Sequence, residues 1–132
     1  MNSRTMEEIL NKIKDFQFSE KFDLVVAIGR GGVVPGYLIS QKLGLDLEIL
    51  GIKFRNDQNE IIFEEPQIVG KINSEFSGKN IILVDDVSRT GKTFALAKKY
   101  LNDAGVVKTL AINGLADYSI YNEECFKFPW IL

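Results

Sequence analysis

The sequence has 132 residues, 45% hydrophobic and 26% charged, which predicts one globular domain over residues 1–132 with a core of its own. The net charge of −2 argues against nucleic acid or an anionic membrane as the main partner. No apolar run approaches the roughly 20 residues of a membrane span, and the N-terminal stretch is too acidic for a signal peptide. The sequence has no histidine, which excludes a histidine-based triad and a histidine zinc site, so any metal is expected to be Mg²⁺. A single cysteine excludes an internal disulfide, so we expect a cytoplasmic protein.

The N-terminal part is expected to form a helix followed by a strand. Thr5 and Glu8 match a capping box, in which each side chain bonds the backbone N–H of the other residue. Apolar residues then recur at helical spacing as far as Phe16. DLVVAI, at residues 23–28, is a short run rich in β-branched residues. Such runs are typical of strands that are buried on both faces.

A second helix and a second strand follow. Pro35 suits the first turn of the helix, and Gly44 suits its end. LEILGIKF, at residues 47–54, predicts the second strand. The stretch 55–78 is polar and acidic, with short β pieces at most near residues 61–63, and it is predicted to be the most mobile part of the chain.

The C-terminal half continues the same alternation. NIILVD, at residues 80–85, predicts a third buried strand. A helix with one apolar face is expected to begin at Gly91 and to be stopped by Gly105. VVKTLAI, at residues 106–112, predicts a fourth strand, and the aromatic tail at residues 117–132 is partly strand-like.

This alternation predicts an α/β fold with an open, mainly parallel sheet flanked by helices. In such sheets ligands bind at the carboxyl ends of the strands. Two stretches are expected there: GRGG, at residues 29–32, after the first strand, and DDVSRTGKT, at residues 85–93, after the third.

Neither stretch is a nucleotide-binding motif of a common type. GRGGVV is not a dinucleotide fingerprint, because Val34 occupies the position of the third glycine. RTGKT is not a Walker A loop, because Asp86 stands five positions before Gly91, where that motif needs a glycine. A kinase-like protein that hydrolyses ATP is therefore not expected.

Residues 85–93 nevertheless suit a sugar phosphate. A turn that opens a helix presents backbone N–H groups and the hydroxyls of Thr90 and Thr93 at the positive end of the helix dipole, and Gly91 allows close approach. Taken alone, this turn could be an ordinary helix cap. The adjacent carboxylates of Asp85 and Asp86 repel each other unless they bind something, and vicinal sugar hydroxyls with Mg²⁺ nearby fit them.

These stretches resemble a known family. ILVDDVSRTGKT, at residues 82–93, resembles the phosphoribosyl-pyrophosphate-binding motif of the type I phosphoribosyltransferases. VVAIGRGGVVPGYLISQKLG, at residues 25–44, resembles the pyrophosphate loop and following helix of their xanthine-guanine and hypoxanthine members. The resemblance covers residues 23–112 and implies their fold, here with a minimal C-terminal hood. It also implies Mg²⁺-dependent transfer of ribose 5-phosphate from phosphoribosyl pyrophosphate to a nucleobase, which would be purine-like, in a homodimer or homotetramer.

The resemblance also implies roles for individual residues. Asp85 and Asp86 would hold the ribose hydroxyls, with Asp86 near Mg²⁺, and these two residues and Arg30 would be the catalytic ones. The 5-phosphate would lie in a loop formed by Ser88, Arg89, Thr90, Gly91, Lys92 and Thr93. The pyrophosphate would contact Arg30, Gly31, Lys53 and Arg55, although Arg30, Lys53 and Arg55 could also be ordinary surface cations. Catalysis would need little beyond positioning, charge stabilisation and a loop at residues 55–71 that closes over the site.

Two base-contacting residues of the family's purine enzymes are absent. Arg89 stands where those enzymes have an aspartate that contacts the base, and arginine stays protonated and cannot act as a base. AINGLADY, at residues 111–118, replaces a turn that has a lysine. Trp130, in FPW, resembles an aromatic residue that stacks on the purine, although it could equally pack in the core. Arg89 and Trp130 are the candidate base contacts, and the alternative function is a sensor or regulator that binds phosphoribosyl pyrophosphate or nucleotides.

Overall fold

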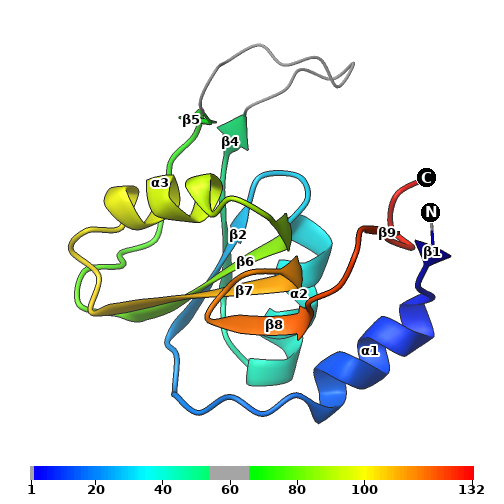
Figure 1. Ribbon diagram of the computed structural model, residues 1–132. Helices are drawn as coiled ribbons and strands as arrows, with labels where there is room; N and C mark the ends of the chain where they lie inside the picture. The colour runs from blue at the N-terminus through cyan, green and yellow to red at the C-terminus, as the bar shows by residue number, and fades with distance from the viewer. Residues whose placement is uncertain (1, 54–65) are drawn as a thin grey trace.

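The computed structural model describes residues 2–53 and 66–132. At its centre is a five-stranded sheet in the order β3-β2-β6-β7-β8 (Figure 1). Every pairing in this sheet is parallel. The strands are β2 (Leu24–Ile28), β3 (Leu47–Leu50), β6 (Asn80–Ser88), β7 (Val106–Gly114) and β8 (Tyr118–Tyr121). The predicted open, parallel α/β sheet is confirmed.

Helices cover both faces of the sheet. They are α1 (Met6–Asp15), α2 (Val33–Leu43) and α3 (Lys92–Tyr100). On one face, Ile9 of α1 and Ile39 of α2 pack with Ile82 of β6, and on the other face Phe94 of α3 packs with Leu83. Figure 1 shows the same division, with α3 on the opposite side of the sheet from α1 and α2. Because successive residues of β6 fill two cores, its sequence reads as a continuous apolar run.

The predicted helix starts are confirmed, and one predicted end is wrong. Thr5 and Glu8 form the capping box: Thr5 Oγ1 accepts from the Glu8 N–H at 3.1 Å, and the Thr5 N–H donates to Glu8 Oε1 at 3.2 Å. Gly44 caps α2 with φ 67°. Helix α3 ends at Tyr100 instead of continuing to Gly105. The intervening residues form a turn, in which the Gly105 N–H bonds Lys79 O at 2.8 Å and so starts β7 beside β6.

The second predicted strand is divided. Only β3 pairs with β2, whereas β4 (Ile52–Lys53) pairs antiparallel with β5 (Gln67–Ile68) in a separate ribbon. Gly51 lies at the break and accepts a bond from the Val69 N–H at 2.8 Å. The β pieces expected near residues 61–63 lie outside the described residues.

Strands β6 and β7 run further than predicted. Strand β6 continues past Asp85 to Ser88, because Val87 and Ser88 pair with Asn113 and Gly114 of β7. Gly114 has φ 123°, and a Cβ there would lie 1.9 Å from Ser88 O. Only glycine therefore lets the two strand ends approach this closely.

The chain ends meet in a small hood. Strand β1 (Asn2–Ser3) pairs in parallel with β9 (Phe126–Lys127), and Figure 1 shows the two termini side by side. Residues 122–125, here called the strap, connect β8 to β9. Within the described residues, no helix combines the length and apolar character needed to cross a bilayer.

Candidate functional site

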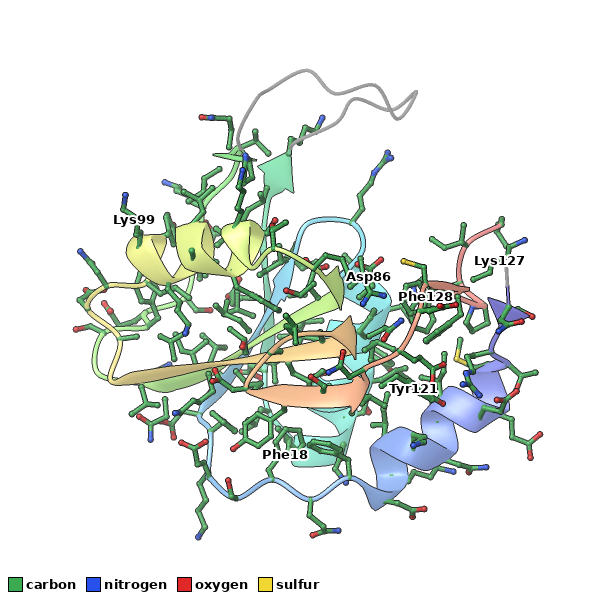
Figure 2. All side chains as sticks on the ribbon, viewed as in Figure 1. Phe18, Asp86, Lys99, Tyr121, Lys127 and Phe128 are labelled. Atoms are coloured by element: carbon green, nitrogen blue, oxygen red, sulfur yellow. The ribbon has the colours of Figure 1, made fainter. Side chains whose placement is uncertain are left out.

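The two predicted loops meet at the carboxyl end of the sheet. A Cβ added to Gly31 would lie 2.6 Å from Asp86 Oδ2, so the GRGG backbone rests directly against the carboxylate that follows the third predicted strand. A Cβ at Gly32 would lie 2.5 Å from Val84 O. Both glycines are therefore needed for close contact between the loop and β6. Figure 2 shows Asp86 at the end of the sheet that also faces the tail carrying Phe128.

The adjacent carboxylates are held by the backbone. Asp85 Oδ1 accepts from the Asp86 N–H at 2.8 Å, and Asp86 Oδ1 accepts from the Val87 N–H at 2.7 Å. Burial raises the pKa of Asp85 well above its ordinary value, and the charge of Asp86 raises this pKa further. The ionised pair is therefore destabilised by burial and mutual repulsion, which hydroxyl donors or a cation bound to the carboxylates would offset.

Residues 88–93 form a cradle at the N-terminus of α3. Gly91 takes φ 78° at the N-cap, no side chain caps the helix, and the first turn has no acidic residue. The Lys92 N–H lies 3.3 Å from Thr90 Oγ1. A small open hollow of about 60 Å³ is lined by Asp85 and residues 87–94. Uncapped helix N–H groups, a positive dipole end and two hydroxyl side chains suit an oxyanion such as a phosphate.

The predicted pyrophosphate cations differ in their placement. Arg30 is exposed on the GRGG loop, next to Gly31. Lys53 is exposed on β4, which begins beside this loop, since a Cβ at Gly29 would lie 3.1 Å from Ile52 O. Arg55 lies outside the described residues. The pyrophosphate roles of Arg30, Gly31 and Lys53 stay predictions, although all three lie in or near one loop.

The donor set suits a metal that is shared with a ligand. In the described ranges no three acidic, cysteine or histidine side chains gather into a cation site. At this site the described part of the chain therefore offers the Asp85–Asp86 pair. Mg²⁺ is commonly bound by one or two carboxylates together with substrate phosphates and water, so the pair fits this mode of binding.

The exposed side chain of Arg89 reaches the strap. Its Nη2 donates to Glu123 O at 3.1 Å and to Cys125 Sγ at 3.4 Å, so the side chain links the cradle to the strap. The backbone of Arg89 is part of the predicted phosphate loop, whereas its guanidinium contacts the strap that leads to the hood. Its two predicted contacts, with the phosphate and with the base, stay predictions.

Asn113 was not predicted as a site residue. It is only 1% exposed, its Nδ2 donates to Glu124 O at 3.2 Å, and its Oδ1 accepts from the Glu123 N–H at 3.0 Å. It fixes the strap to the end of β7. A polar residue that interrupts the apolar run LAIN was the available signal, because buried amides are normally fully bonded.

Trp130 packs within the tail. Its ring stacks on Phe128 with centroids 4.8 Å apart and an interplanar angle of 10°. Its Nε1 is buried without a hydrogen-bond partner among residues that the structure describes. This contact accounts for the core-packing alternative, and stacking on a base stays a prediction.

The chain is similar in sequence to known proteins. The phosphoribosyl transferase domain profile matches residues 3–113. The orotate phosphoribosyltransferase of Sulfurisphaera tokodaii is 30% identical over 112 residues, which cover 83% of this chain and 51% of that protein. The transcriptional regulator GfcR of Methanococcus vannielii is 30% identical over 114 residues, which cover 84% and 53%. The chain thus spans about half the length of these curated relatives.

Solved structures share the fold. The crystal structure of a purine phosphoribosyltransferase from Pyrococcus horikoshii superposes with a TM-score of 0.78 at 25% identity, covering 98% of this chain and 92% of that one. The family profile spans most of the chain, including the GRGG loop, the paired carboxylates and the cradle. The chain therefore belongs to the type I phosphoribosyltransferase family.

Proposed function

We propose that this protein is an Mg²⁺-dependent phosphoribosyltransferase. It would transfer ribose 5-phosphate from phosphoribosyl pyrophosphate to a nucleobase, purine-like by the resemblance of its motifs, and release pyrophosphate. One observation supports this most: the backbone of Gly31 lies against the carboxylate of Asp86, next to an uncapped helix start. A single ligand with a 5-phosphate, vicinal hydroxyls and a pyrophosphate has the groups that these three features would bind.

In this proposal each residue binds or orients the substrate. Residues 88–93 bind the 5-phosphate through backbone N–H groups and hydroxyls. Asp85 and Asp86 accept hydrogen bonds from the ribose hydroxyls, which orients the anomeric carbon. The GRGG loop directs N–H groups and the charge of Arg30 at the departing pyrophosphate. Mg²⁺, held by Asp86 and the substrate, would neutralise charge on the leaving group.

This proposal requires little acid–base chemistry from the chain. The bond from ribose to pyrophosphate breaks with positive charge building on the sugar, so positioning and stabilisation of the leaving group lower the barrier most. The absence of histidine is compatible with such a reaction.

Release of pyrophosphate tests the proposal. The protein is incubated with phosphoribosyl pyrophosphate, Mg²⁺ and one member of a panel of purine and pyrimidine bases, and the expected result is base-dependent release. The Asp86→Asn variant is the control, because its amide places an N–H donor where the hydroxyls and the metal need acceptors. Release that requires no base, or that is unaffected by Asp86→Asn, would contradict the assignment.

The alternative is a sensor that keeps the ligand site without turnover. It is favoured by Arg89, which cannot act as a base and is bound to the strap, and by similarity to the transcriptional regulator GfcR. For the sensor, phosphoribosyl pyrophosphate or a nucleotide binds, and no base in the panel gives turnover. Robust turnover of any base would eliminate this alternative.

We further propose a cytoplasmic homodimer or homotetramer. The exposed thiol of Cys125 suits a reducing compartment. Light scattering of the purified protein tests the assembly, and a monomer mass at micromolar concentration would contradict it.

A further inference from the structure

Arg89 borders the hollow in which a ligand would lie. It lines this hollow together with Asp85 and the cradle. In a ribose the carbon that holds the base adjoins the carbon that holds the 2-hydroxyl. A ribose with its hydroxyls on Asp85 and Asp86 therefore holds its base close to the carboxylates, and Arg89 follows Asp86 by three residues at the same end of the sheet.

The strap holds the guanidinium of Arg89 in one orientation. Its Nη2 bonds Glu123 O and Cys125 Sγ. The strap is held in turn by the buried Asn113, whose Nδ2 donates to Glu124 O and whose Oδ1 accepts from the Glu123 N–H. From the hood, Arg4 makes an ion pair with the Glu123 carboxylate and lies over the ring of Tyr121, 4.9 Å from its centroid. Figure 2 shows Tyr121 at the side of the sheet that faces α1.

The remaining donors of Arg89 are available to a ligand. Both of its contacts within residues 2–53 and 66–132 use Nη2, and there the N–H groups of Nε and Nη1 have no acceptor. Arginine remains protonated at all accessible pH values, so these groups are permanent donors with a positive charge. A group facing them must offer lone pairs, because an N–H on the ligand would oppose an N–H on the protein.

We propose that Arg89 determines specificity by selecting a base with an anionic group on the edge beside its ribosylated nitrogen. This inference rests on the proposed phosphoribosyl transfer. A neutral base offers the guanidinium only uncharged acceptors in place of the water that it loses, and these form weaker hydrogen bonds than a charged acceptor. An anionic edge replaces that water with a charge-assisted hydrogen bond, and it also offsets the repulsion between Arg89 and the positive charge that builds on the sugar.

Matched nucleotides test the inference by calorimetric titration. Orotidine and uridine 5-phosphate differ by one carboxylate next to the ribosylated nitrogen. Xanthosine and inosine 5-phosphate differ by an oxo group that allows the purine ring to be anionic at neutral pH. Each is titrated into the wild type, Arg89→Gln and Arg89→Lys, with ribose 5-phosphate as the probe that lacks a base.

The wild type is expected to bind the anionic member of at least one pair about ten- to a hundredfold more tightly, as a charge-assisted hydrogen bond predicts. Arg89→Gln should reduce this preference to within about twofold, and Arg89→Lys should keep most of it. The preference is the ratio of two dissociation constants for the same protein, so any change in 5-phosphate binding that both members of a pair share cancels. Equal binding within both pairs, or a preference that survives Arg89→Gln, overturns the inference. If Arg89→Gln fails to fold, loss of the preference in a folded Arg89→Lys overturns it.

The same titrations separate this inference from the proposed function. If the wild type binds ribose 5-phosphate but shows no preference within either pair, the specificity role of Arg89 is refuted and the proposed function is not. Wild-type protein that does not bind ribose 5-phosphate contradicts the proposed function, and the inference falls with it.

Discussion

Substituting Gly31 by alanine perturbs the contact between the GRGG loop and Asp86 directly. The new Cβ would lie 2.6 Å from Asp86 Oδ2 and 2.7 Å from its Cγ. Ordinary van der Waals separation is about 3.5 Å, so the carboxylate must move by roughly 1 Å. Because the obstructing atoms belong to a short side chain and not to backbone, the fold should tolerate this shift.

The shift has two expected costs. The bond from the Val87 N–H to Asp86 Oδ1, 2.7 Å long, weakens or breaks, which lowers the free energy of unfolding by about 1 kcal/mol. Displacement of a ligand-orienting group by roughly 1 Å can reduce its effect on the order of a hundredfold. We therefore expect the dissociation constant of phosphoribosyl pyrophosphate to rise about ten- to a hundredfold, with a small loss of stability.

Calorimetric titration with phosphoribosyl pyrophosphate and Mg²⁺ measures the effect. Gly70→Ala is the matched control, because among the described residues its Cβ would meet only backbone atoms of Gly51, at 3.8 Å or more. The control should bind as the wild type does. If Gly31→Ala also binds within about twofold of the wild type while remaining folded, Asp86 is not held against the ligand as we infer.

Three further outcomes are expected. Asn113→Ala removes both bonds to the strap and should lower the free energy of unfolding, measured in urea, by about 2 kcal/mol. Asn122→Ala, at an exposed position of the strap, is the control and should change this free energy by less than about 0.5 kcal/mol. Equal effects of the two substitutions would contradict the role of Asn113. The pKa of Asp85 is raised from 3.8 in the folded state, so its contribution to stability is present at acidic pH and lost as pH rises through the raised pKa. At neutral pH the ligand-free Asp85→Asn protein should therefore be more stable in urea than the wild type, yet bind phosphoribosyl pyrophosphate less tightly, and a less stable variant would refute the charge argument. Thr93→Val removes one cradle hydroxyl and should weaken ribose 5-phosphate binding about fivefold to tenfold; unchanged binding would place the phosphate elsewhere.

Local sequence patterns predicted much of the fold because their causes are local. The capping box of Thr5 and Glu8, the turn at Gly44 and the apolar run of β6 each depend on neighbouring residues. The break at Gly51 depends instead on β5, a distant partner that pairs with β4. The turn after α3 likewise involves a distant partner, because the Gly105 N–H bonds Lys79 O.

The site divides in the same way. Asp85, Asp86 and the cradle are contiguous in the sequence, so their chemistry could be inferred before their geometry was known. That GRGG and the paired carboxylates lie at one edge of the sheet followed from the rule for parallel sheets. The contact between Gly31 and Asp86 became apparent only in the structure. The contacts of Arg89 join residues 34 and 36 positions apart. They depend on how Asn113 holds the strap, and no local pattern indicates that arrangement.

The central claim is that the GRGG loop, the paired carboxylates and the cradle bind one sugar-phosphate ligand. Thermal unfolding with increasing phosphoribosyl pyrophosphate in the presence of Mg²⁺ tests it most directly. A ligand at a hundred times its dissociation constant adds about 2.7 kcal/mol, which should raise the unfolding midpoint by roughly 10 °C in a domain of this size. A midpoint that does not move at millimolar ligand would contradict the claim.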